Sequence, residues 1–182
     1  MKIIKTKISG PIIIEPRVFN DSRGYFFEPY NKKIFDQKIE KINFVQDNES
    51  ESSFGVFRGF HFQKPPHEQA KLVRCIKGEI IDFALDIRKN SPTFGKFEKI
   101  TLSDRNKKQF FIPRGFAHAF LVVSNIALVS YKVDNYYEPE SESGVFWDDP
   151  NLKIDWGIEK NELIISEKDR NLELLFKIKT ST

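Results

Sequence analysis

The chain has 182 residues, a length typical of one domain, and its 18 phenylalanines and 5 tyrosines favour half-buried strand positions over helix interiors. Its 29 basic and 26 acidic residues nearly cancel and are dispersed, which argues against binding of nucleic acid or of a charged membrane surface. Cys75 is the sole cysteine, so no disulfide can form within the chain, and the lack of a signal peptide or membrane-spanning run predicts a cytoplasmic protein.

Short runs of strand-forming residues recur along the chain, each bounded by turn formers. They cover residues 12–15, 25–30, 42–47, 56–63, 71–76, 79–87, 96–102, 109–112, 117–123, 127–134 and 145–147. About ten short strands indicate an all-β sandwich or barrel. No repeat or change of composition divides the chain, so we expect a single domain over residues 1–182, with residues 177–182 as a flexible tail.

Two segments carry signals for the start of a helix. Asn31 can cap a short helix that runs through Ile39, with its apolar side chains on one face. The stretch Ser166-Glu-Lys-Asp169 resembles a capping box that opens a C-terminal turn or helix. We expect both segments to lie outside the β core.

The motifs argue against phosphate-loop and metal chemistry. None of the nine glycines forms the Gly-x-Gly-x-x-Gly or Walker pattern. The segment Pro113-x-Gly115-x-x-His118 has the spacing of the second cupin motif, in which a tight turn enters a barrel strand and aims a histidine inward. Metal cupins carry an earlier His-x-His, which here is His61-Phe-Gln63, so three zinc or iron ligands are hard to assemble. We expect neither a metal nor a cofactor.

A metal-free site needs a base, an acid and a group that holds developing negative charge. A histidine has an unperturbed pKa near 6.5, so His61 is a candidate base, above all if a carboxylate orients its other nitrogen. Lys71 is a candidate for stabilising an oxyanion. Tyr131 shares a strand face with Ala127 and Val133, so its side chain is expected to point into the barrel.

Each candidate also has a purely structural interpretation. His61 and Tyr131 can be ordinary core residues of strands, and Asp169 can be the reciprocal partner in a helix cap. Arg58 and His61 are three positions apart and would face opposite sides of a regular strand. Gly59 between them is a natural bulge site that could turn both side chains toward one cavity.

Ten motifs follow one another in order from Arg17 to Asp169. They are Asp21-Ser-Arg23-Gly24-Tyr-Phe-Phe-Glu28, Phe44-Val-Gln46-Asp47-Asn48, Gly55-Val-Phe-Arg58-Gly-Phe-His61-Phe-Gln63, Lys71-Leu-Val-Arg74, Ser91-Pro-Thr-Phe-Gly95, Ile112-Pro-Arg-Gly-Phe-Ala-His118, Tyr131-Lys132, Tyr136-Tyr137, Trp147-Asp-Asp-Pro150 and Ser166-Glu-Lys-Asp169. In combination they resemble the dTDP-4-dehydrorhamnose 3,5-epimerase family.

This resemblance implies a cupin-type jelly-roll barrel with short peripheral helices, and a homodimer that shares strands between its subunits. It implies that His61 is the general base and that Asp169 orients it. Tyr131 would be the general acid on the opposite face, and Lys71 would face the enolate oxygen. The family's contacts to the nucleotide sugar fall on Arg23, Glu28, Gln46, Asn48, Arg58, His118, Glu142 and Lys168, and Tyr137 matches the aromatic residue that stacks on thymine.

The expected reaction is epimerisation of dTDP-4-dehydro-6-deoxy-D-glucose at C3 and C5, which gives dTDP-4-dehydro-L-rhamnose. The sequence departs from the family pattern at Glu49, where histidine is usual, and at Ala119, where glycine is usual. Relatives that invert only C3 or only C5, or that use another nucleotide-linked 4-keto sugar, would keep nearly the same residues. A non-catalytic sugar-nucleotide-binding cupin and a metal-dependent cupin are the alternatives from other classes.

Overall fold

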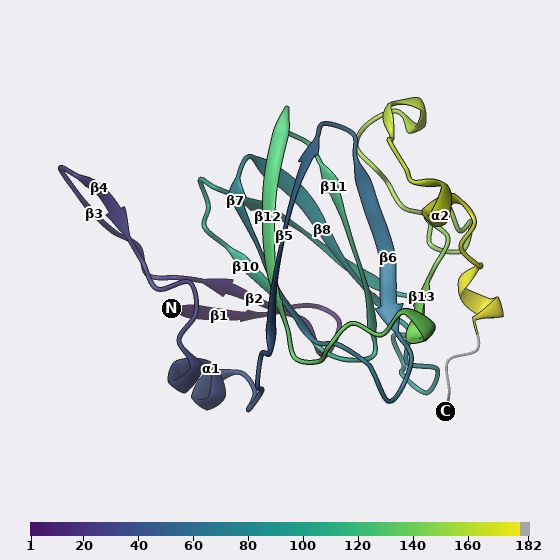
Figure 1. Cartoon of the computed structure of the whole chain (residues 1–182), viewed down its shortest axis with the longest axis horizontal. Helices are drawn as coiled ribbons and strands as arrows, with labels where there is room; N and C mark the ends of the chain where they lie inside the picture. The colour runs from purple at the N-terminus through teal and green to yellow at the C-terminus, as the bar shows by residue number, and fades with distance from the viewer. Residues whose placement is uncertain (179–182) are drawn as a thin grey trace.

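The computed structural model describes residues 1–178 and consists mainly of two antiparallel sheets that face each other (Figure 1). The larger sheet has the strand order β1 (Lys2–Lys5), β2 (Ile12–Glu15), β10 (Gln109–Ile112), β7 (Lys71–Lys77), β12 (Ile126–Val133) and β5 (Gln46–Ser53). The smaller has the order β13 (Glu142–Gly144), β6 (Phe57–Gln63), β11 (Phe116–Val122), β8 (Glu79–Asp86) and β9 (Phe97–Ser103). Strand pairing does not close the two sheets into a continuous barrel within residues 1–178.

Short helices and turns lie around these sheets, as expected. Helix α1 (Lys32–Lys38) begins at Asn31, whose side chain accepts a hydrogen bond from the Ile34 backbone. Helix α2 (Glu167–Arg170) begins at Ser166, and three 3-10 turns cover Pro139–Ser141, Lys160–Glu162 and Leu175–Lys177. The predicted all-β jelly roll with short peripheral helices is confirmed.

Three apolar clusters hold the layers together. The first fills the space between the sheets and includes Val73, Phe110 and Phe120. A second covers the outer face of the smaller sheet, where the C-terminal segment contributes Trp156 and other side chains. The third lies under α1, on the outer face of the larger sheet. Strands β8 and β11 are covered on both faces, which explains their nearly continuous apolar sequences.

Most predicted strands match the structure to within one or two residues, but three were misplaced. Residues 25–30 form only the short strand β4 (Gly24–Phe26), residues 42–45 lie before β5 rather than in a strand, and β13 ends before Val145. Two short strands, β1 and β3 (Phe19–Asp21), and most of β5 were not predicted. β5 was missed because all eight of its residues are polar or charged, whereas strand prediction looks for apolar residues at every second position.

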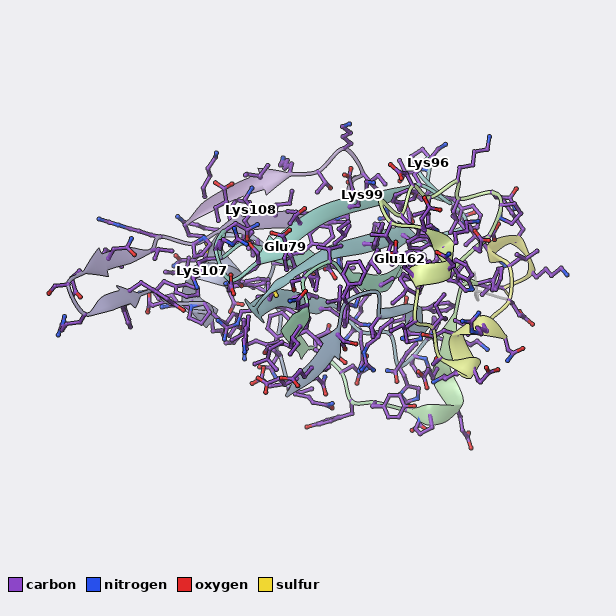
Figure 2. All side chains as sticks on the ribbon, turned by 90° about the horizontal axis from the view of Figure 1, so that it is seen from above. Glu79, Lys96, Lys99, Lys107, Lys108 and Glu162 are labelled. Atoms are coloured by element: carbon purple, nitrogen blue, oxygen red, sulfur yellow. The ribbon has the colours of Figure 1, made fainter. Side chains whose placement is uncertain are left out.

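The hairpin of β3 and β4 extends away from the body as an arm, which both views show (Figures 1 and 2). Its aromatic side chains are exposed: Phe19 to 49%, Tyr25 to 57% and Phe26 to 66%. At its base, the Lys107 ammonium lies 4.0 Å from the centre of the Tyr25 ring. An arm with so much exposed apolar surface has few contacts of its own to stabilise it.

The C-terminal segment continues the packing of the smaller sheet. Leu175 and Ile178 are buried in the cluster on its outer face. The remaining part of the predicted tail, residues 179–182, lies outside the described residues. No helix of the described chain is long and apolar enough to cross a membrane.

Candidate active site

A cavity of about 550 Å³ opens between the two sheets, and a smaller one of about 270 Å³ adjoins it. His61, Lys71 and Tyr131 line both, so the two cavities form one continuous site. Together the cavities contain every candidate residue except Arg23 and Glu28. The larger is lined by Arg58, His61, Lys71, His118, Tyr131, Lys168 and Asp169, and the smaller adds Gln46, Asn48, Tyr137 and Glu142.

His61 and Asp169 form a close pair although they are far apart in the sequence. Nε2 of His61 lies 2.7 Å from Oδ1 of Asp169, and the carboxylate also accepts a hydrogen bond from the Gly59 backbone. Burial raises the pKa of Asp169, but these hydrogen bonds outweigh it and leave the pKa below its usual value. An ionised Asp169 therefore accepts a hydrogen bond from Nε2–H, which leaves Nδ1 of the neutral ring unprotonated and able to act as a base.

The same contacts separate the two interpretations of Asp169. The Ser166 hydroxyl caps α2 by accepting a hydrogen bond from the Asp169 backbone. The Asp169 carboxylate points instead to His61 and is 4% exposed. The helix cap thus belongs to Ser166, and it holds Asp169 in place for its contact with the ring.

A bulge in β6 brings Arg58 and His61 to the same side, as the glycine between them suggested. Phe120 pairs with Arg58 and His118 pairs with His61, so three steps along β6 match two along β11. Gly59 has a φ of +134°, and a Cβ there would overlap the side chain of Ala119 and the adjacent backbone. Only glycine fits this close approach of the two strands.

Tyr131 and Lys71 stand on the opposite wall, on neighbouring strands of the larger sheet. Burial raises the pKa of the Tyr131 hydroxyl, so this group keeps its proton at neutral pH. The Lys71 ammonium lies 5.9 Å from the centre of the Tyr131 ring. Burial of this ammonium group lowers the pKa of Lys71 to about 8, although the negative charges of Asp82 and Glu142 oppose the shift.

His118 is held by a buried carboxylate that the sequence analysis did not single out. Its Nε2 lies 2.7 Å from Oδ1 of Asp82, and the two side chains are 6% and 0% exposed. Burial lowers the pKa of His118 and raises that of Asp82, so both shifts favour the uncharged form of the side chain. An aspartate within the otherwise apolar run of residues 80–85 was the signal that could have identified Asp82 from sequence.

Polar residues from three segments line the outer part of the site. Glu142 accepts hydrogen bonds from the Tyr137 hydroxyl at 2.5 Å and from the Lys168 ammonium at 2.6 Å. Gln46 donates to Asn48 at 2.8 Å along β5. This end of the site offers donors, acceptors and an aromatic ring to a polar ligand.

Arg23 and Glu28 lie outside the cavity of their own chain, so the structure does not bring these two residues together with the other candidates. Arg23 lies on the arm, pairs with Asp21 at 2.6 Å and has an 88% exposed side chain. Glu28 is exposed near the start of α1 and accepts a weak hydrogen bond from Asn31 at 3.3 Å. Sequence position alone cannot reveal this separation.

The two departures from the family pattern leave the lining of the cavity intact. Glu49 is exposed and lines neither of the two joined cavities. Ala119 is fully buried beside Gly59, on the face of β11 that packs against the C-terminal segment. Sequence analysis missed two other residues, Ser50 and Ser52, which lie on the inward face of β5.

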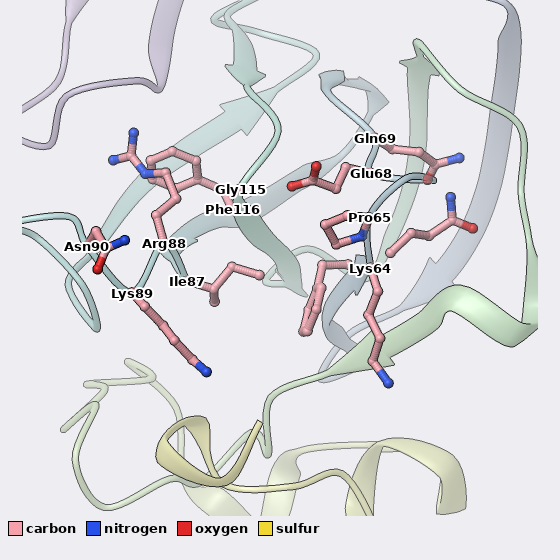
Figure 3. Close-up of a pocket in the computed structure, with 12 residues that line it drawn as sticks. Lys64, Pro65, Glu68, Gln69, Ile87, Arg88, Lys89, Asn90, Gly115 and Phe116 are labelled. Atoms are coloured by element: carbon pink, nitrogen blue, oxygen red, sulfur yellow. The ribbon is translucent and has the colours of Figure 1, made fainter. Parts of the chain in front are cut away.

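A separate cavity of about 220 Å³ contains none of the catalytic candidates (Figure 3). One of the basic residues that line it, Arg88, lies over the Phe116 ring and is paired with Asp86 at 2.7 Å. Among residues 1–178 no group of three or more histidine, cysteine or acidic side chains is placed to hold a metal ion. The joined cavities remain the candidate active site.

The model of the dTDP-4-dehydrorhamnose 3,5-epimerase family matches residues 5–177. The chain belongs to this family. A dTDP-4-dehydrorhamnose 3,5-epimerase of Methanothermobacter thermautotrophicus is 54% identical over 171 residues, which cover 93% of this chain and 92% of the relative.

Solved structures of the family agree closely with the fold. The epimerase of Elizabethkingia anophelis is 52% identical with a TM-score of 0.93, over 100% of this chain and 99% of that one. An epimerase of Legionella pneumophila, solved in complex with dTDP-4-keto-L-rhamnose, is 44% identical with a TM-score of 0.93, over 97% and 94% of the two chains. The jelly roll is therefore of the cupin type found in these epimerases.

Replacement of Asp169 by asparagine distinguishes the orienting role from a capping role. We expect Asp169→Asn to lower kcat at least about 100-fold, because an amide cannot stabilise an imidazolium as a carboxylate does. The melting temperature should change little, because Ser166 supplies the cap. As a control, Ser166→Ala should cost about 1 kcal/mol of stability. An Asp169→Asn enzyme with a lowered melting temperature and near-normal turnover would contradict the orienting role.

Proposed function

We propose that the protein epimerises dTDP-4-dehydro-6-deoxy-D-glucose at C3 and C5 to dTDP-4-dehydro-L-rhamnose, as a step of rhamnose-type sugar biosynthesis. Membership of the family supports this reaction. The observation that carries the mechanism is the placement of His61, paired with Asp169, across one cavity from Tyr131. We also propose that this reaction takes place in the cytoplasm.

Proton removal is assigned to His61. The keto group at C4 of the sugar acidifies the C–H bonds at both C3 and C5, so one base can begin the reaction at either carbon. The Asp169 carboxylate fixes the ring and stabilises its protonated form. Lys71 holds the negative charge that forms on the C4 oxygen, and its site within the cavity strengthens this interaction.

Proton return is assigned to Tyr131. Inversion requires that a proton leave one face of the ring and return to the other, and Tyr131 and His61 stand on facing sheets. The raised pKa of Tyr131 keeps its hydroxyl protonated until the enolate forms. The same two residues can therefore invert both carbons in turn.

Substrate binding is assigned to the polar residues around these groups. Arg58, Lys168 and His118 surround the larger cavity and suit a diphosphate. Tyr137 is exposed at the rim, where it can stack on the thymine base, and Glu142, Gln46 and Asn48 line the adjoining cavity. Binding energy from the nucleotide then holds the sugar ring between base and acid.

We propose that Arg23 and Glu28 contact the substrate in the cavity of a second copy of the chain. We assign the functional unit as a homodimer in which the arm of one copy reaches the cavity of the other. The support is the exposed Arg23 on an aromatic arm, outside its own cavity, although its motif matches a substrate contact of the family. Contact with a partner would cover the exposed apolar surface of the arm.

Hydrogen exchange in heavy water tests the division of labour. The wild type should give product that carries deuterium at C3 and C5, whereas His61→Ala should abolish both exchange and inversion. Tyr131→Phe keeps the ring but lacks the acid, so we expect exchange without net inversion at one carbon or more, measured by NMR. A Tyr131→Phe enzyme that inverts both carbons at the wild-type rate would overturn the role of Tyr131. Deuterium at only one carbon in the wild type would indicate a single-centre epimerase.

The pKa of Lys71 predicts an alkaline limit to activity. Lys71 loses its charge as the pH rises through about 8, so kcat/KM, which reports on the free enzyme, should fall above that pH. Lys71→Arg keeps a cation at all accessible pH values and should move the alkaline limb upward, even if the maximal rate is lower. An alkaline limb that stays at the same pH in Lys71→Arg would show that Lys71 does not set it.

Mixed dimers test the role of the arm. Arg23→Ala and His61→Ala subunits should each have little activity alone at low substrate concentration. When the two are refolded together, one site in each mixed dimer combines an intact His61 with an intact Arg23 from the other copy, so activity should return. Mixed dimers that stay inactive would show that each arm serves its own subunit.

A further inference from the structure

The guanidinium of Arg58 is anchored by a residue to which no role has been assigned. Nε of Arg58 donates a hydrogen bond to the hydroxyl of Ser52 at 3.1 Å. Within residues 1–178 this is the one hydrogen bond of the Arg58 side chain. Arg58 lines the larger cavity, and its two terminal nitrogens have no hydrogen-bond partner among residues 1–178.

Ser52 is well suited to anchor another side chain because its own position is fixed. It is 7% exposed and lies on the inward face of β5, where its backbone pairs with that of the fully buried Ala127. Its neighbour Ser53 points the other way and is exposed. Serine has few rotamers to lose, so a buried hydroxyl holds its direction at little entropic cost.

The contact also joins two sheets. β5 is the edge strand of the larger sheet and β6 belongs to the smaller, and a turn of three residues connects them. Arg58 is the second residue after this turn and is exposed, so its long side chain would otherwise sample many rotamers. The bond to Ser52 restrains the plane of the guanidinium before any ligand arrives.

We propose that Ser52 is a positioning residue that prepares Arg58 to bind the diphosphate of a nucleoside diphosphate sugar. Arginine binds phosphate best through two parallel N–H groups in one plane, and Ser52 leaves that pair of groups free while it occupies Nε. Restraint of the free side chain lowers the entropy lost on binding, which raises affinity for the ligand. This inference rests on the assignment of Arg58 to the diphosphate in the proposed function.

Binding of dTDP, measured by calorimetry, tests the inference without need of turnover. Ser52→Ala should raise the Kd for dTDP about three- to tenfold, the range that corresponds to the net contribution of one typical hydrogen bond. Ser52→Thr retains the hydroxyl and should stay close to the wild type. Ser53→Ala is the matched control, since it removes a hydroxyl from the outer face of the same strand and should leave Kd unchanged.

A double-mutant cycle separates positioning from a general structural effect. In an Arg58→Ala background, Ser52→Ala should have no further effect on Kd, because the group that it positions is gone. An unchanged Kd in Ser52→Ala, or an equal increase with and without Arg58, would overturn the inference. The proposed function is judged separately, by turnover of the dTDP-linked 4-keto sugar by the wild type. If the wild type does not turn over this sugar but Ser52→Ala still weakens dTDP binding, the proposed function is wrong and the role of Ser52 stands.

Discussion

The proposed chemistry depends on one hydrogen bond, between Nε2 of His61 and Oδ1 of Asp169 at 2.7 Å. This bond joins β6 to the short C-terminal helix α2, which places Asp169 through the cap at Ser166. Because the carboxylate is buried and ionised, it dictates which ring nitrogen carries the proton and which is free. The packing of the C-terminal segment on the outer face of the smaller sheet therefore positions Asp169 beside His61 as well as completing the core.

The two facing sheets form opposite walls of the cavity and carry different sets of polar residues. The smaller sheet carries His61 and Arg58, and the larger carries Tyr131 and Lys71. A jelly roll keeps these walls apart by filling the deeper part of the space with apolar side chains and leaving the polar end open. The chemistry of inversion needs this arrangement, because base and acid must approach one ring from opposite sides.

The sequence was sufficient to predict the apolar strands and both helix caps, and the resemblance to a known family supplied most of the candidate residues that line the site. The strands, the caps and the bulge in β6 have local signals, namely alternation, cap residues and the glycine at position 59. Prediction from sequence failed at the polar strand β5, whose inward face lines the cavity at Ser50, because distant strands set the environment of β5 and its sequence shows no alternation of apolar residues. The sequence also contained no sign that Arg23 lies outside the cavity of its own chain, because the direction in which the arm extends leaves no local pattern.

In the proposed mechanism, His61 and Tyr131 act on opposite faces of one sugar ring. A crystal structure of the wild-type protein with dTDP-4-keto-L-rhamnose bound tests it most directly. The ring should lie between the imidazole and the phenol, with C3 and C5 within reach of both and the C4 oxygen toward Lys71. A ring with both side chains on the same face, or a sugar bound outside the joined cavities, would contradict the account.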